Sequence, residues 1–316
     1  MRTITQYTGV FGYGLTSDNA LSPLIIGIRN FEAMKENARK FLKPLLLSKP
    51  DSILASAFRQ LTYLFPFLPR GLKFRWPYYL GDVSVLIDTS NSIEAPMLSG
   101  TYDVELSRAI HRFVKQGSYC VDIGANVGPV TLLLAKLVGA TGRVLAIEPG
   151  SAYCRRLNDN LNLNPELKKR VTLVNIGLSD VKGSLFWEPD PKYPYNAGLS
   201  ADRLSHSGVS VHVDTLDAVI EQQGWRQLDF IKIDVEGMEF EVFRGSLNIL
   251  LQYKPVVLFE TLEIFRKKRN FDPFTQIEDL LNKLDYKLYR ISPEGDLEAV
   301  NLTNLPSNTL AIPCRN

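Results

Sequence analysis

The chain has 316 residues, more than one domain usually contains, and this length predicts one large domain with an extension. Apolar residues make up 45%, enough for a full core, and 36 Lys+Arg against 34 Asp+Glu leave a net charge of +2, which argues against a strongly electrostatic nucleic-acid binder. Three cysteines and three histidines without metal-ligand spacing disfavour a His/Cys metal site.

Residues 1–98 are expected to form an N-terminal extension of helices followed by a β-hairpin. Apolar side chains near a 3.6-residue period predict a helix over Asn30–Leu47, and turn and N-cap residues precede a second helix over Ile53–Leu64. Short apolar runs between Leu72 and Ile93 suggest an antiparallel hairpin. The main domain is therefore predicted to cover residues 99–316.

The location is expected to be cytoplasmic. The sequence shows neither a secretory signal nor an apolar run of the roughly 18 residues that a membrane-spanning helix needs. The apolar run LTYLFPFL at Leu61–Leu68 leaves peripheral membrane contact open, although such a run is more typical of a buried helix end. The sequence gives no indication of the oligomeric state.

From Ser107 onward, helical and strand patterns alternate, which is typical of an α/β fold with a parallel sheet. Helices are expected at 103–116, 128–138 and 151–163. A shorter strand at 183–188 is expected to be peripheral, and 189–210 is expected to be a substrate or lid loop. Seven strands then remain for one doubly wound sheet, at 119–122, 143–147, 171–176, 228–233, 255–260, 286–291 and 308–313.

The turn after the first strand of this sheet, VDIGANVG at Val121–Gly128, is the most informative motif of the chain. Glycines let the backbone approach a ligand closely, and the helix that follows directs its free N–H groups and positive dipole end at that ligand. The turn lacks the G-x-G-x-x-G pattern of dinucleotide-binding loops. Asp122 suits a cationic group better than a phosphate, and S-adenosylmethionine has an ammonium, a sulfonium and no phosphate.

Acidic residues also follow the other strands, where ligands of open α/β sheets bind. Glu148, after the second strand, can accept hydrogen bonds from ribose hydroxyls. This position serves NAD as well as S-adenosylmethionine, so a nicotinamide-dependent oxidoreductase remains the alternative. The acids at strand ends are Asp122, Glu148, Asp180, Asp234 and Glu260.

The richest cluster is IKIDVEGME at Ile231–Glu239. Lys232 and Asp234 share one strand face and could form a structural pair, or Asp234 could hold the methyl donor or take a hydroxyl proton. Glu236 and Glu239 could be helix-dipole partners, or could bind a substrate hydroxyl or a divalent cation. A divalent metal is therefore open but not indicated.

The segments VDIGANVG, VLAIEP, VTLVNIGLSD, LDFIKIDVEGMEFEVFRGS and KPVVLFE resemble the FkbM family of S-adenosylmethionine-dependent methyltransferases, over roughly residues 98–313. The resemblance implies the seven-stranded, Rossmann-like sheet of class I methyltransferases. It also implies methyl transfer, commonly to a hydroxyl oxygen. The expected acceptor is a hydroxyl of a small molecule, sugar or glycan. A non-catalytic or nucleic-acid-directed member of the fold is a further alternative, although the one basic cluster, 266–269, is short.

The resemblance also implies roles for individual residues. Asn196–Ser200 would face the substrate, and Gly177–Asp180 would lie near the adenine, with Ser179 and Asp180 as the expected cofactor-binding residues. A hydroxyl acceptor also needs a base, for which Asp234, Glu236 and a histidine, either His206 or His212, are the candidates. His206 has the better case of the two histidines, because it lies in the long loop. The residues expected to hold the methionine and ribose parts of the cofactor are Asp122, Gly124, Asn126, Gly128 and Glu148.

Overall fold

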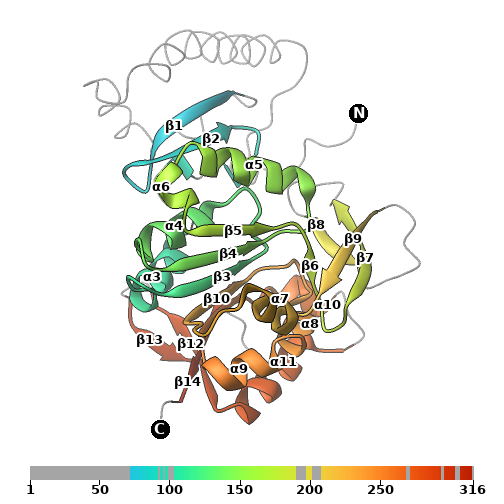
Figure 1. The fold of residues 1–316 in the computed structure, drawn as a ribbon. Helices are drawn as coiled ribbons and strands as arrows, with labels where there is room; N and C mark the ends of the chain where they lie inside the picture. The colour runs from blue at the N-terminus through green and yellow to red at the C-terminus, as the bar shows by residue number, and fades with distance from the viewer. Residues whose placement is uncertain are drawn as a thin grey trace, which may run out of the picture. The chain divides into compact units, whose positions relative to one another are not determined.

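The computed structural model divides the chain into two compact units, Met1–Pro69 and Arg70–Asn316. The structure describes residues 72–91, 93–94, 97–98, 103–189, 197–200, 208–267, 271–292, 295–302 and 307–314, all within the second unit (Figure 1). The helices predicted at Asn30–Leu47 and Ile53–Leu64, and the apolar run at Leu61–Leu68, lie outside the described residues. The predicted division between residues 98 and 99 stays a proposal.

A mixed sheet of eight strands forms the centre of the second unit, in the order β13-β12-β14-β11-β10-β3-β4-β5. The five strands from β11 to β5 are parallel, and β14 pairs antiparallel with both β11 and β12. The strands are β3 (Tyr119–Ile123), β4 (Arg143–Ile147), β5 (Val171–Val174), β10 (Phe230–Ile233), β11 (Val256–Glu260), β12 (Tyr286–Ile291), β13 (Leu297–Ala299) and β14 (Asn308–Pro313).

This topology confirms the predicted Rossmann-like sheet of class I methyltransferases. All seven predicted strands are present, and β13 adds an eighth at the edge. In chain order, the parallel strands follow the 3-2-1-4-5 arrangement of doubly wound folds. The strand order reverses between β3 and β10, so a ligand is expected beyond the carboxyl ends of these strands.

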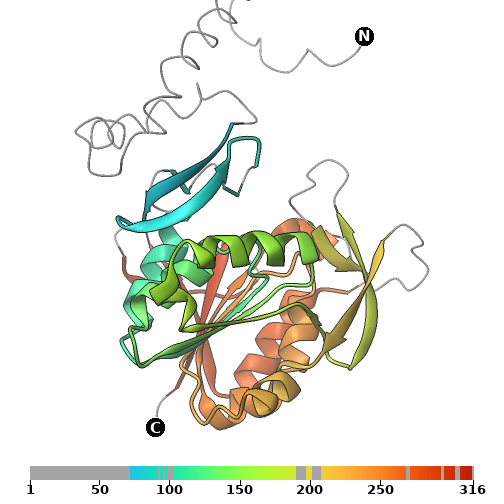
Figure 2. The same ribbon diagram turned by 45° about the horizontal axis from the view of Figure 1, so that its top comes forward.

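Helices cover both faces of the sheet (Figures 1 and 2). Alternate residues of each strand face opposite sides: Cys120 packs in the cluster of α3 and α4, whereas Val121 packs in the cluster of α7, α8, α9 and α11. The helices are α3 (Val104–Phe113), α4 (Pro129–Leu137), α5 (Ser151–Asn162), α6 (Pro165–Lys168), α7 (Leu216–Gln223), α8 (Glu239–Arg244), α9 (Leu247–Tyr253), α10 (Glu263–Lys267) and α11 (Pro273–Lys283). Within the part of the chain that the structure describes, none of the helices has the length and hydropathy to span a membrane.

A second, smaller sheet stands beside the main one, on the right in Figure 1, with the order β6-β9-β7-β8. Its strands are β6 (Gly177–Leu178), β7 (Gly183–Pro189), β8 (Ala197–Ser200) and β9 (Val209–Asp214). The strand predicted at 183–188 is β7, and it is peripheral as expected. The expectation of a loop throughout 189–210 is wrong, because β8 lies within that stretch; four residues are too few to show a hydrophobic period.

The predicted hairpin is present as β1 (Lys73–Tyr79) and β2 (Val83–Asp88), which pair antiparallel. It belongs to the same compact unit as the main sheet, and β2 contacts α5. Trp76, Tyr79, Val85 and Ile87 are buried. The hairpin therefore has a set of buried apolar side chains and contacts the sheet domain at α5.

Candidate functional site

A cleft opens at the carboxyl ends of β3, β4 and β10, where the strand order reverses. Its open space, solvent included, is about 760 Å³. The glycine turn, the end of β4 and the turn after β10 contribute most of the wall. The lining residues are Ile93, Ile123, Gly124, Ala125, Asn126, Pro129, Val130, Ile147, Glu148, Pro149, Tyr153, Ile176, Gly177, Leu178, Lys232, Asp234, Val235 and Glu236.

The glycines of the turn after β3 are required by packing against neighbouring elements. Gly124 has φ +75°, and a Cβ there would lie 1.8 Å from the carbonyl oxygen of Asp234. Gly128, the N-cap of α4, has φ +97°, and a Cβ there would lie 2.2 Å from Cδ1 of Leu157. The turn can therefore approach both β10 and α5 closely, and this approach brings Gly124 and Asn126 into the cleft wall.

Glu148 is held rigidly at the end of β4. Its Oε2 accepts a hydrogen bond from the backbone N–H of Asn126 at 2.9 Å, and its Oε1 accepts one from Gly150 at 2.7 Å. Burial raises the pKa of Glu148 to about 7, and the two backbone hydrogen bonds oppose that rise. Each oxygen keeps a further lone pair for a hydrogen-bond donor in the cleft.

Lys232 connects the acids at the ends of β3 and β10. Its Nζ lies 3.5 Å from Oδ1 of Asp122 and 3.4 Å from Oδ2 of Asp234, and it donates to the carbonyl oxygen of Gly124 at 3.1 Å. Asp122 is fully buried and also accepts a hydrogen bond from Thr131 Oγ1 at 2.5 Å. Burial raises the pKa of Asp122, while Lys232 and Thr131 oppose the rise.

A tight turn after β10 brings three more carboxyl groups together. Glu236 has φ +58° and lines the cleft. Glu239 is buried and accepts hydrogen bonds from the backbone N–H groups of Val235 and Gly237, both at 3.2 Å, and burial raises its pKa to about 7. Glu260, at the end of β11, has its pKa raised to about 9, first by burial and then by the charges of Asp234, Glu236 and Glu239.

The structure brings five of the predicted site residues into one cleft wall: Gly124, Asn126, Glu148, Asp234 and Glu236. Asp122 lies behind the wall, beneath Lys232 and Thr131, rather than in it. Gly128 packs on Leu157. Ser179 and Asp180 are not in the wall either, but their neighbours Gly177 and Leu178 are. His206 and Asn196 lie outside the described residues.

Some lining residues escape sequence reasoning. Tyr153 lines the cleft from α5, and its ring contacts that of Trp187 edge-on at 5.7 Å. Ile93 comes from the segment after the hairpin, far from any motif. From the amphipathic pattern of α5, Tyr153 is expected only to be partly buried. No sequence motif indicates that it lines a binding site. Among the described residues, no group of three or more His, Cys, Asp or Glu side chains could hold a metal ion.

Sequence comparison gives a family and two curated relatives. The methyltransferase FkbM domain matches residues 122–288. The methyltransferase sdnD of Sordaria araneosa is 30% identical over 40% of this chain and 60% of its own length. The hexuronic acid methyltransferase AglP of Haloferax volcanii is 29% identical over 43% of this chain and 53% of its own length. The chain thus spans little more than half the length of these relatives.

Solved structures with a similar fold include a methyltransferase FkbM from Methylobacillus flagellatus KT, with 16% identity, a TM-score of 0.40 and coverage of 70% of this chain and 52% of that chain. An O-methyltransferase from Bacillus cereus in complex with SAH has 15% identity, a TM-score of 0.38 and coverage of 66% of this chain and 79% of that chain.

The strand order and the cleft at the carboxyl ends of the parallel strands define a Rossmann-like protein with the sheet of class I methyltransferases. Because the matched domain covers more than half of the residues, the chain belongs to the FkbM methyltransferase family.

Proposed function

We propose that this protein is an S-adenosylmethionine-dependent methyltransferase that methylates a hydroxyl oxygen of a small molecule, sugar or glycan. The observation that carries the proposal is a single cleft lined by the glycine turn, by Glu148 and by the Asp234–Glu236 turn. Family membership supports methyl transfer as the reaction. A relative named for hexuronic acid methylation favours a sugar hydroxyl as the acceptor.

The chemistry of the cleft fits this cofactor. Glu148, Asp234 and Glu236 supply carboxylates to the wall, and Lys232 is the one cationic side chain among the described lining residues. Carboxylates attract an ammonium or sulfonium and accept hydrogen bonds from ribose hydroxyls. They repel a pyrophosphate, which counts against the nicotinamide-dependent alternative. Glu148 would hold the ribose, and the turn at Gly124 and Asn126 would hold the methionine part.

Held by Glu148 and by the turn at Gly124 and Asn126, S-adenosylmethionine would supply an activated methyl group for transfer to the acceptor oxygen. The protein must therefore position the acceptor and exclude water. Asp234 is the proposed general base, because it lines the cleft and is partly exposed. It would take the hydroxyl proton as the new bond forms. Lys232, 3.4 Å away, would orient the Asp234 carboxylate.

Transfer of a tritiated methyl group to fractionated cell extract, followed by mass analysis of the labelled product, tests this proposal. We expect transfer by the wild type, and an Asp234→Asn variant to lose roughly a hundredfold or more of the rate. Asp159→Asn, at an exposed position on α5, is the matched control and is expected to keep full activity.

Two outcomes would contradict the proposal. Binding of NAD instead of S-adenosylmethionine would support the oxidoreductase alternative. Binding of S-adenosylmethionine without transfer to any fraction would support a non-catalytic member of the fold. If transfer occurs but Asp234→Asn retains the full rate, the base is a different residue, and Glu236→Gln is the next variant to measure.

A further inference from the structure

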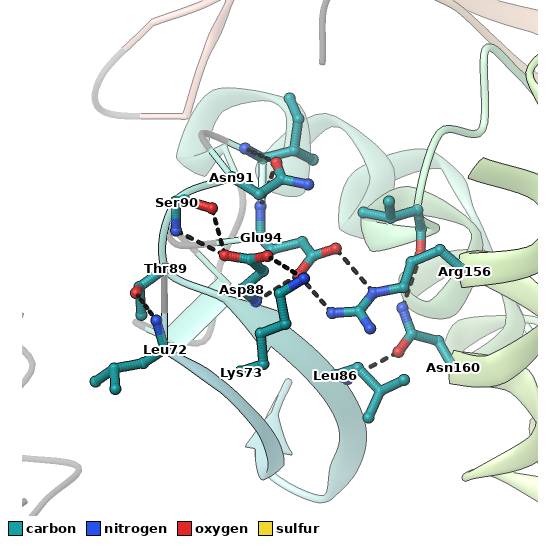
Figure 3. Close-up of polar contacts among 12 residues, drawn as sticks. Leu72, Lys73, Leu86, Asp88, Thr89, Ser90, Asn91, Glu94, Arg156 and Asn160 are labelled. Carbon is teal, nitrogen blue, oxygen red and sulfur yellow. Dashed lines mark hydrogen bonds and ion pairs between the residues drawn. The ribbon is translucent and has the colours of Figure 1, made fainter. Parts of the chain in front are cut away.

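The segment that precedes the main sheet in the chain forms hydrogen bonds and an ion pair with α4 and α5, two helices that contribute residues to the cleft. Figure 3 shows the polar contacts between this segment and α5. We use the term clamp segment for residues 72–91 and 93–94, which comprise the β1–β2 hairpin and the turn after it. Three groups of these contacts bear on the cleft: those of two asparagines, one ion pair and one tyrosine.

Two asparagine side chains bind the backbone of β2. Asn160 Oδ1 accepts from the N–H of Leu86 at 2.8 Å, and Asn164 Oδ1 accepts from that of Ser84 at 2.9 Å. Asn160 lies on α5 and Asn164 is the N-cap of α6, and the two N–H groups that they bind are two residues apart on β2, so both face the same edge of that strand. The two amide side chains thus accept the backbone hydrogen bonds that a neighbouring strand would otherwise accept at this edge of β2. Asn160 also donates to the carbonyl oxygen of Val127 at 2.8 Å, which ties β2 to the glycine turn.

An ion pair between a buried carboxylate and a partly exposed arginine fixes the end of the clamp segment to α5. Arg156 donates from Nε to Oε1 of Glu94 at 2.9 Å and from Nη2 to Oε2 at 2.7 Å. Glu94 is 3% exposed, and its Oε2 also accepts from the N–H of Asp88 at 2.5 Å. A two-point Arg–carboxylate contact at a buried carboxylate fixes both position and orientation.

Residues next to these contacts line the cleft. Ile93, the neighbour of Glu94, lines it, and so does Tyr153, one helical turn before Arg156. The hydroxyl of Tyr79 donates to the carbonyl oxygen of Pro129 at 2.9 Å, and Pro129 is both a lining residue and the first residue of α4. The clamp segment therefore contributes Ile93 to the cleft lining and, through Tyr79, contacts the start of the helix that follows the glycine turn.

We propose that the Glu94–Arg156 pair, with Asn160, is a positioning device for the cofactor cleft, which holds Ile93 in the wall and fixes the glycine turn through Val127. The pair contacts no reacting atom, so it acts on cofactor binding rather than on the transfer step. This inference rests on the proposed function for the identity of the cofactor. The predicted order in the glycine turn does not depend on it.

The test uses the full chain with Glu94→Gln, which keeps the shape and removes the charge, and Arg156→Lys, which keeps the charge and removes the two-point contact. Glu298→Gln is the matched control, because Glu298 pairs with Arg290 at 2.6 Å on an exposed part of the sheet. Calorimetry measures the Kd of S-adenosylmethionine, steady-state kinetics separate KM from kcat, and amide hydrogen exchange of residues 124–130 is followed in the cofactor-free protein.

We expect Glu94→Gln to raise the Kd by about tenfold, to raise KM more than it lowers kcat, and to speed exchange at residues 124–130. Arg156→Lys should change the same quantities in the same direction and by less, and Glu298→Gln should change none of them. A folded Glu94→Gln protein with unchanged exchange at 124–130 would overturn the inference. If the wild type does not bind S-adenosylmethionine, the proposed function fails, and the exchange measurement still decides whether the pair orders the turn.

Discussion

At the residue scale, Gly124 shows that the packing of neighbouring strands, and not only contact with a ligand, can require a glycine in a site. A Cβ at this position would overlap the backbone oxygen of Asp234, so β3 and β10 can meet at the cleft only if residue 124 has no side chain. The positive φ adds a second requirement for glycine. The sequence pattern identifies the glycine, whereas the reason for it depends on a strand more than a hundred residues away.

Gly224→Ala provides a matched comparison for Gly124→Ala. Both glycines have a positive φ, +75° at Gly124 and +64° at Gly224, but nothing lies within 4 Å of a Cβ at Gly224. The backbone cost alone is roughly 1–2 kcal/mol, which we expect for Gly224→Ala. Gly124→Ala should lower the free energy of unfolding by clearly more, as measured by urea denaturation. Equal losses in the two variants would contradict the steric explanation.

The burial of two further residues, Asp122 and Asn160, could not be predicted from the sequence. Asp122 is predicted as a cofactor ligand because it stands between a buried strand and a glycine turn. The structure buries it beneath Lys232 and Thr131, and only the packing of β10 on β3 reveals this. The helical pattern of α5 places Asn160 on a polar face, yet it is fully buried, because β2 covers that face.

At the element scale, β10 carries the charge that joins the two parallel strands at the cleft. Lys232 is opposite Asp122 in the β10–β3 register, and its side chain is buried together with the Asp122 carboxylate. A buried charge that loses its partner is costly, whereas the loss of both partners is less so. The Lys232–Asp122 pair therefore makes a testable contribution to the stability of this end of the sheet.

We expect Lys232→Met to lower the free energy of unfolding by about 3–5 kcal/mol, because it leaves the Asp122 carboxylate buried without its cation. Adding Asp122→Asn should recover part of that loss, since the amide keeps an acceptor for Thr131 and carries no charge. Denaturant titrations of both single variants and the double variant give the coupling energy. Strict additivity would show that the two side chains do not interact.

The elements that sequence reasoning found and those that it missed differ in length. The helices predicted at 103–116, 128–138 and 151–163 are present as α3, α4 and α5, with bounds that differ by at most three residues. A continuous apolar period over ten or more residues leaves little ambiguity. The strands β6, β8 and β13 have two to four residues each and depend on partners in the sheet rather than on a local pattern.

At the scale of the whole molecule, several acids at one end of the sheet make stability dependent on pH. Glu260 has an ordinary pKa of 4.5 when exposed and a pKa of about 9 in the folded protein. Between these two values the folded state binds the proton and the unfolded state releases it. Stability is therefore highest below the unfolded pKa and falls as the pH rises through the folded pKa.

Calorimetric melting at pH 6 and pH 9 tests this linkage. We expect the Tm of the wild type to fall more between these pH values than that of Glu260→Gln, since the variant cannot ionise at this position. Glu148 and Glu239 titrate in both proteins, so the difference between the two isolates Glu260. An equal fall of Tm in the two proteins would show that the surroundings do not raise the pKa of Glu260.

The fold as a whole follows from the sequence more fully than the site does. The alternation of helix and strand and the acids at strand ends predict the sheet and its ligand-binding edge. The wall of the cleft, however, combines Ile93, Tyr153 and Lys232 from three distant segments. Only the packing of the hairpin on α5, and of β10 on β3, brings those three residues together.

The central claim is that the cleft binds S-adenosylmethionine through Glu148. Calorimetric titration of the full chain tests it most directly, with the wild type and Glu148→Gln at pH 8 and the wild type again at pH 6. Since the pKa of Glu148 is about 7, its carboxylate is ionised at pH 8 and mostly protonated at pH 6. We expect one binding site, with affinity about tenfold lower in Glu148→Gln and also lower for the wild type at pH 6. Absence of binding by the wild type, or equal affinity in the variant, would contradict it.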